Sequence, residues 1–185
     1  MKKDSESIKL IKPTEELESE FFAMIEEFKA EGREVMDGIG SIDIENFKDS
    51  VKQAEDHAKG IGLPDGWVPA STYWLICQNR IVGTCNLRHE LNDFLREFGG
   101  HVGFSIRPSE RNKGYGTQML RLLLKKTQEL GIERVLATCD DNNIASSRVI
   151  EKNGGKFANK VTKDDSEVPI RRYWIDLSVG DVNAI

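Results

Sequence analysis

The residues from Gly103 to Gly116, GFSIRPSERNKGYG, combine glycine, basic and hydroxyl side chains in a pattern suited to holding a phosphate. The stretch opens with an alternating apolar run, and Pro108 ends it because proline donates no ladder hydrogen bond. The last two glycines open a helix, whose first backbone N–H groups lack internal partners and carry partial positive charge. Arg111 and Lys113 add full charges there. The stretch predicts a cradle of backbone amides for a pyrophosphate. The glycines have a second explanation, because a tight turn favours residues without a side chain whether or not it binds a ligand.

The elements around this stretch follow from the period of the apolar residues and from the glycines and prolines between them. The predicted elements are a strand at 8–12, a helix capped by Thr14 and ended by Gly32, a helix capped by Asp43 and ended by Gly60, strands at 72–77 and 81–87, a short helix or loop at 90–98, a strand at 102–106, a helix at 117–130, a strand at 134–139, a helix at 143–153, and a hairpin of 156–161 with 170–177. This order indicates an α/β (α+β) chain with helices on a mixed sheet.

Length and composition restrict the class of protein. A chain of 185 residues suits one domain, 1–185, and its net charge of −5 argues against a nucleic-acid partner. No apolar run approaches the roughly 20 residues of a membrane span, and no apolar segment follows Lys2 and Lys3 as in a signal peptide. The three cysteines have no metal-ligand spacing and lie in apolar contexts, so we expect buried free thiols, no metal and a cytoplasmic protein.

The chain contains three short motifs: Ile106-Arg107-Pro108, the run from Arg111 to Gly116, and Asn143-Ile144-Ala145-Ser146. Together these motifs resemble the GCN5-related N-acetyltransferases. The stretch from Asn143 to Gly155 looks like a branch known mainly as predicted acetyltransferases. The resemblance implies a mostly antiparallel sheet of six to seven strands, splayed in the middle and flanked by about four helices.

The resemblance also implies how acetyl-CoA is bound. The pantetheine arm would lie between the strands at 103–106 and 135–139, and the pyrophosphate would lie on backbone amides at the glycine turn. A backbone amide near Ser105 or Ile106 would stabilise the oxyanion, a contribution of about 3 kcal/mol for one donor. The residues implied to bind the cofactor are Phe104, Ser105, Ile106, Arg111, Asn112, Lys113, Gly114, Tyr115, Gly116, Thr117, Asn143 and Ser146.

The implied reaction is direct transfer of the acetyl group to a primary amine of a small molecule or peptide. Glu90 is our candidate for the base that accepts the amine proton, directly or through water; Asp93, His89 and His101 are alternatives. The family often protonates the departing thiolate with a tyrosine seven residues after the asparagine, but Ile150 stands there in this chain. Ser146 or Tyr115 could replace it, or the thiolate leaves unassisted.

The acceptor amine would meet a surface built from the first two helices, the loop 60–69 and the final hairpin. Its acidic residues suit a cationic amine, but ordinary surface charge explains them equally, and we favour that interpretation. Trp67 either lines the mouth or fills the edge of the core, and we favour the core. The same helices could form a homodimer face. The acidic residues are Glu31, Glu34, Asp37, Asp43, Glu45 and Asp65.

Two other functions compete with an acetyltransferase. Gly114-x-Gly116 before a helix and Asp140 after the next strand resemble a dinucleotide turn. However, Met119 occupies the third glycine position, and the turn lies mid-chain after three predicted strands. A domain that binds acyl-CoA without catalysis, as a sensor, is the second alternative, which the missing tyrosine favours.

Overall fold

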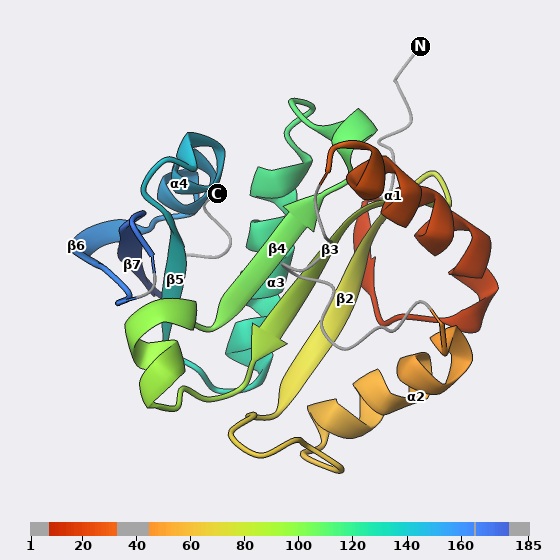
Figure 1. The fold of residues 1–185 in the computed structure, drawn as a ribbon, viewed down its shortest axis with the longest axis horizontal. Helices are drawn as coiled ribbons and strands as arrows, with labels where there is room; N and C mark the ends of the chain where they lie inside the picture. The colour runs from red at the N-terminus through yellow and green to blue at the C-terminus, as the bar shows by residue number, and fades with distance from the viewer. Residues whose placement is uncertain (1–7, 33–44, 165, 178–185) are drawn as a thin grey trace.

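A seven-stranded sheet forms the centre of the computed structural model, which describes residues 8–32, 45–164 and 166–177 (Figure 1). Its spatial order is β1-β2-β3-β4-β5-β7-β6, and every neighbouring pair is antiparallel except β4 and β5. This confirms the predicted mixed, mostly antiparallel sheet. The strands are β1 (Lys9–Ile11), β2 (Ala70–Cys77), β3 (Arg80–Arg88), β4 (Val102–Ile106), β5 (Arg134–Asp140), β6 (Lys156–Val161) and β7 (Ile170–Asp176).

Four α-helices in the described residues lie against this sheet: α1 (Glu18–Ala30), α2 (Phe47–Ala58), α3 (Tyr115–Glu129) and α4 (Ile144–Lys152). Alternate residues of β2 separate two cores, because successive side chains of a strand point to opposite faces. Trp74 is fully buried with α1 and α2, where Phe21 stacks on it at 5.3 Å. Leu75 is fully buried in the other core, which α3 covers. The helices thus enclose both faces of the central strands.

The sheet divides between its two parallel strands. β4 pairs with β3 over five positions, from Gly83↔Ile106 to Leu87↔Val102. Toward β5, in contrast, the described register is the single position Val102↔Ala137. Figure 1 shows the two ribbons close at the lower end of β4 and separating upward toward α3 and α4. The predicted splay of the sheet is therefore present, and it opens at the C-terminal end of β4.

Several predicted details change in the structure. The long helix begins at Tyr115 rather than at residue 117, because Gly114 adopts φ +85° and the helix follows at once. Residues 95–99 form a π-helical turn, η2 (Leu95–Gly99), and Pro108–Glu110 form a 3-10 turn, η3. Our favoured interpretation of Trp67 was wrong: its side chain is 54% exposed, with its ring edge-on to His57. The predicted cap Asp43 lies outside the described residues.

The cysteines are free and buried, as predicted. Burial raises the pKa of Cys139 to about 11, so its thiol stays protonated at neutral pH. Within the described ranges we find no helix with both the length and the apolar character needed to cross a bilayer. The same ranges contain no cluster of three or more acidic, histidine or cysteine side chains suited to a metal ion.

Candidate functional site

A cavity of about 640 Å³ lies where β4 and β5 separate. The C-terminal half of β4 forms one wall, the start of α3 forms the end, and α4 forms the opposite wall. The lining residues are Phe28, Phe104, Ser105, Ile106, Glu110, Arg111, Asn112, Gly114, Tyr115, Gly116, Thr117, Asn143, Ala145, Ser146, Arg148, Val149 and Lys152. The structure therefore brings together all the predicted cofactor-binding residues except Lys113.

The end of the cavity is the N-terminus of α3. Gly114, its N-cap, is left-handed, and Asn112 before it also has positive φ, at +62°. No side chain in the described part of the chain caps this helix, and its N-terminus presents partial positive charge to the cavity. A Cβ on Gly116 would lie 3.1 Å from Val149 Cγ2, so this glycine lets α3 approach α4 closely. The predicted arrangement of a strand, a glycine turn and a helix start is thus present.

Ion pairs to α1 fix the loop between β4 and α3. Arg107 is 3% exposed, and its guanidinium donates to Glu27 Oε1 at 2.7 Å and to Glu20 Oε2 at 2.9 Å. Glu27 Oε2 accepts the Ser109 N–H at 3.0 Å. Burial alone would raise the pKa of Glu27, but the bonds from Ser109 and Arg107 outweigh it and hold the pKa below its usual value. One carboxylate therefore joins α1 both to Arg107, just before η3, and to Ser109 within it.

The loop's own cations are also matched by carboxylates. Glu110 is 6% exposed and bonds Arg80 and Lys113, each at 2.8 Å. Arg111 pairs with Glu31 at 2.8 Å and also donates to the Ile106 carbonyl at 3.3 Å. The Lys113 ammonium is engaged in this network, and the residue does not line the cavity. The charge of Lys113 is thus directed to Glu110 rather than to the predicted cradle.

The opposite wall begins at Asn143, which caps α4. Its Oδ1 accepts the Ser146 N–H at 3.0 Å, so the side chain is oriented by the helix end. Ser146 follows on the first turn and also lines the cavity. The position where the resemblance expects a tyrosine, Ile150, is fully buried in the core. Tyr115 donates its hydroxyl to the Cys77 sulfur at 3.4 Å, a contact with the core side of the cavity.

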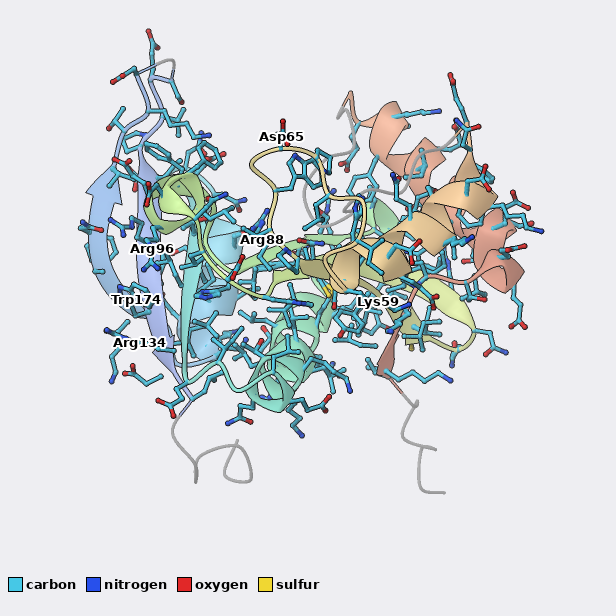
Figure 2. The ribbon with its side chains drawn as sticks, turned by 90° about the horizontal axis from the view of Figure 1, so that it is seen from below. Lys59, Asp65, Arg88, Arg96, Arg134 and Trp174 are labelled. Atoms are coloured by element: carbon cyan, nitrogen blue, oxygen red, sulfur yellow. The ribbon has the colours of Figure 1, made fainter. Side chains whose placement is uncertain are left out.

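The candidate bases lie at the other end of β4. Glu90 is exposed, follows β3, and is not among the cavity-lining residues. Asp93 is likewise exposed, and His89 Nε2 lies 2.9 Å from the Ser71 hydroxyl. Figure 2 shows this end of the molecule from below, with Arg88 at the end of β3 and Asp65 on the 60–69 loop. The structure thus does not bring Glu90 together with Ser146.

His101, at this same end of β4, is buried and bonded to the backbone of β5. It is 7% exposed, and its Nδ1 accepts the Leu136 N–H at 2.9 Å. Burial lowers the pKa of His101 to about 4, and the charges of Arg88 and Arg96 lower it further, so the imidazole is neutral at pH 7. Burial likewise lowers the pKa of His89, against the opposing charge of Glu90. Both imidazoles are therefore unprotonated at neutral pH.

Sequence reasoning missed several lining residues. Phe28 comes from α1, and only the tertiary fold brings it to the cavity. Glu110 was overlooked because it lies in a loop that we interpreted as basic from Arg111 and Lys113. Arg148 and Lys152 could have been found, because they recur with Ala145 and Val149 at helical spacing on one face of α4.

Comparison with known proteins identifies the family. A sequence model of the acetyltransferase (GNAT) domain matches residues 10–156. The chain belongs to the GNAT acetyltransferase family. The N-acetyltransferase YnaD of Bacillus subtilis, itself uncharacterised, is 35% identical over 65 residues, a match that spans 33% of this chain and 38% of YnaD.

Solved structures confirm the GNAT fold. RimL, a ribosomal alpha-N-protein acetyltransferase, superposes with a TM-score of 0.66 at 17% identity, covering 92% of this chain and 90% of RimL. The microcin self-immunity acetyltransferase MccE, in complex with acetyl-CoA and AMP, gives 0.67 at 16% identity, covering 94% and 93%. A GNAT sheet with one parallel junction is not the parallel sheet of a dinucleotide fold, so that alternative was wrong.

Proposed function

We propose that this GNAT protein transfers the acetyl group of acetyl-CoA directly to a primary amine of a small molecule or peptide. The observation that carries the proposal is the cavity at the divided sheet, with a strand on one side and an uncapped helix N-terminus at its end. The acetyl-CoA in the MccE complex agrees with this cofactor. We assign the activity to a single domain acting in the cytoplasm.

The cavity offers a different contact for each part of acetyl-CoA. The backbone of Phe104 to Ile106 would pair with the amides of the pantetheine arm, as an added strand pairs with a sheet. The N–H groups that begin α3 would bind the pyrophosphate, with the Thr117 hydroxyl beside them. Asn143 would contact the pantetheine from the opposite wall.

The chemistry needs a neutral amine and a stabilised oxyanion. The amine nitrogen attacks the thioester carbonyl, the carbon–sulfur bond breaks, and the sulfur departs as a thiolate. A backbone N–H near Ser105 or Ile106 would stabilise the oxyanion. Glu90 does not line the cavity, so we propose that it accepts the amine proton only through intervening water, and that Ser146 or solvent protonates the thiolate.

Thermal unfolding with acetyl-CoA, CoA and NAD tests the cofactor. A ligand at a hundred times its Kd stabilises the folded state by about 2.7 kcal/mol, which shifts Tm by several degrees. We expect a shift with both CoA ligands and none with NAD. No shift with acetyl-CoA would refute the assignment of the cavity.

Release of free CoA thiol then tests catalysis, using a panel of polyamines, amino sugars and peptides with free N-termini. Thiol release that depends on an amine supports the enzyme. Binding of acetyl-CoA with no release above the spontaneous rate for every amine would instead favour the sensor alternative.

A further inference from the structure

We propose that Arg148 and Lys152 form a second anion site in the cavity, which binds the 3′-phosphate of the CoA ribose. This inference rests on the proposed function, because it takes CoA as the ligand. It adds a specificity: the protein would distinguish CoA from 3′-dephospho-CoA, which retains the pyrophosphate and the pantetheine arm.

The two cations belong to one face of α4. Ala145, Arg148, Val149 and Lys152 all line the cavity, at positions i, i+3, i+4 and i+7 of the helix. Val149 lies at the inner, half-buried part of this face, against Gly116, whereas Arg148 and Lys152 are exposed. The charged groups therefore lie at the rim of the cavity, across from the loop that precedes α3.

The other charges of the cavity are already balanced. Among its lining residues, Glu110 is paired with Arg80 and Lys113, and Arg111 is paired with Glu31. Neither Arg148 nor Lys152 forms an ion pair with any residue that the structure describes. The rim of α4 thus contributes two positive charges that no described carboxylate neutralises.

Like charges at i and i+4 of a helix repel each other. Arg148 and Lys152 stand at this spacing, and an anion between them would remove the repulsion. Phosphate suits the pair, because an arginine donates two parallel hydrogen bonds to its oxygens and a lysine adds a point charge.

One ligand must then carry two anionic groups. The uncapped N-terminus of α3 offers the first anion site, and the α4 rim offers the second on another wall of the same cavity. CoA has this distribution, with a pyrophosphate on the 5′ carbon and a monophosphate on the 3′ carbon of one ribose. The pantetheine amides continue from the pyrophosphate toward β4.

Isothermal calorimetry with CoA and 3′-dephospho-CoA tests the site. We expect the wild type to bind CoA about tenfold more tightly, the effect of losing charge-assisted hydrogen bonds to one phosphate. In the double variant Arg148→Gln with Lys152→Gln, the two Kd values should converge, because CoA binding weakens while dephospho-CoA binding changes little. Lys125→Gln is the matched control: Lys125 is an exposed cation of α3 outside the cavity, and its loss should leave the preference intact.

Three results would overturn the site: equal wild-type affinity for the two ligands, a preference that survives in the double variant, or equal weakening of both. Equal weakening would mean that Arg148 and Lys152 contact the pyrophosphate or stabilise the fold, and do not bind the 3′-phosphate. Failure of both ligands to bind the wild type would refute the proposed function itself. Circular dichroism of each variant verifies folding, which we expect to persist because both side chains are exposed.

Discussion

The imidazole Nδ1 of His101 accepts a 2.9 Å hydrogen bond from the backbone N–H of Leu136, while the His101 N–H donates to the Leu136 carbonyl at 2.7 Å. The His101 side chain therefore accepts a hydrogen bond that a backbone carbonyl of the neighbouring strand would accept in a continuous ladder. These bonds join β5 to β4 at the closed end of the divided sheet, next to the Val102↔Ala137 pair. His101 thus fixes where the two strands begin to separate.

The stability of the fold should depend on the protonation of His101. Burial lowers the pKa of His101 in the folded protein from 6.5 to about 4, so the unfolded chain binds a proton that the folded chain does not. The free energy of unfolding should therefore decrease as pH falls from about 6.5 toward 4, by up to about 3 kcal/mol. Urea unfolding at several pH values measures the effect.

His101→Asn provides the comparison for this prediction. The asparagine Oδ1 can accept the Leu136 N–H in place of Nδ1, but it does not titrate. Other groups contribute equally to both proteins, so the difference between the two curves isolates His101. Parallel curves for wild type and variant between pH 4 and pH 6.5 would show that this histidine is not the source.

Gly114→Glu should abolish acetyl-CoA binding. The substitution places a negative charge at the start of α3, where we expect the pyrophosphate, and it forces a side chain into a left-handed residue with φ +85°. The strain costs about 1–2 kcal/mol of stability. Gly131→Glu imposes the same strain at φ +74°, with open space around the new Cβ, but beyond the other end of α3. Calorimetry should show normal binding for Gly131→Glu only; normal binding by folded Gly114→Glu would disprove the cradle.

Glu27→Gln should destabilise the protein and weaken acetyl-CoA binding together. The variant leaves the buried guanidinium of Arg107 short of a carboxylate, at a cost of about 2 kcal/mol. The Ser109 N–H loses its charged acceptor, so the loop before α3 becomes less well ordered. Glu26→Gln is a neighbouring control, since Glu26 is 70% exposed and pairs with Lys29 within α1. Equal unfolding midpoints for the two variants would contradict this role.

Glu90→Gln should lower turnover most at low pH and leave acetyl-CoA binding unchanged. At low pH the amine is protonated and needs a base, whereas at high pH the neutral amine reacts without one. Glu97→Gln, an exposed acid in η2 at the same end of the molecule, is the control. A wild-type pH–rate profile for Glu90→Gln would remove Glu90 from the mechanism and assign the proton to solvent.

Local patterns were enough to predict the order of the elements and the part of the site carried by short motifs. The turn at Gly114 and the cap at Asn143 are local features, determined by residues a few positions apart. Contacts over long sequence separations could not be predicted in this way. Glu27 reaches Arg107 across 80 residues, and Phe28 reaches the cavity from the same helix, so both depend on how α1 packs against η3.

Exposure was also difficult to predict from composition. Trp67 is large and apolar, which favours burial, yet it stands at the surface beside His57. The hairpin of 156–161 with 170–177 was predicted correctly, and in the structure strand alternation puts Tyr173 in the core and Trp174 on the other face. Figure 2 shows Trp174 beside Arg134, whose guanidinium lies 4.6 Å from its ring centre.

The separation of β4 and β5 gives this sheet four edges instead of two. β1 and β6 form the outer edges, and the parted strands β4 and β5 add two inner edges, of which that of β4 lines the cavity. Exposed strand edges are templates for pairing with another chain, and proteins usually cover or charge them. A ligand that lies along the inner edges would cover them in the same way. We therefore expect the ligand-free protein to aggregate at a temperature below the one that its unfolding midpoint alone would predict. Acetyl-CoA should protect the protein from this aggregation.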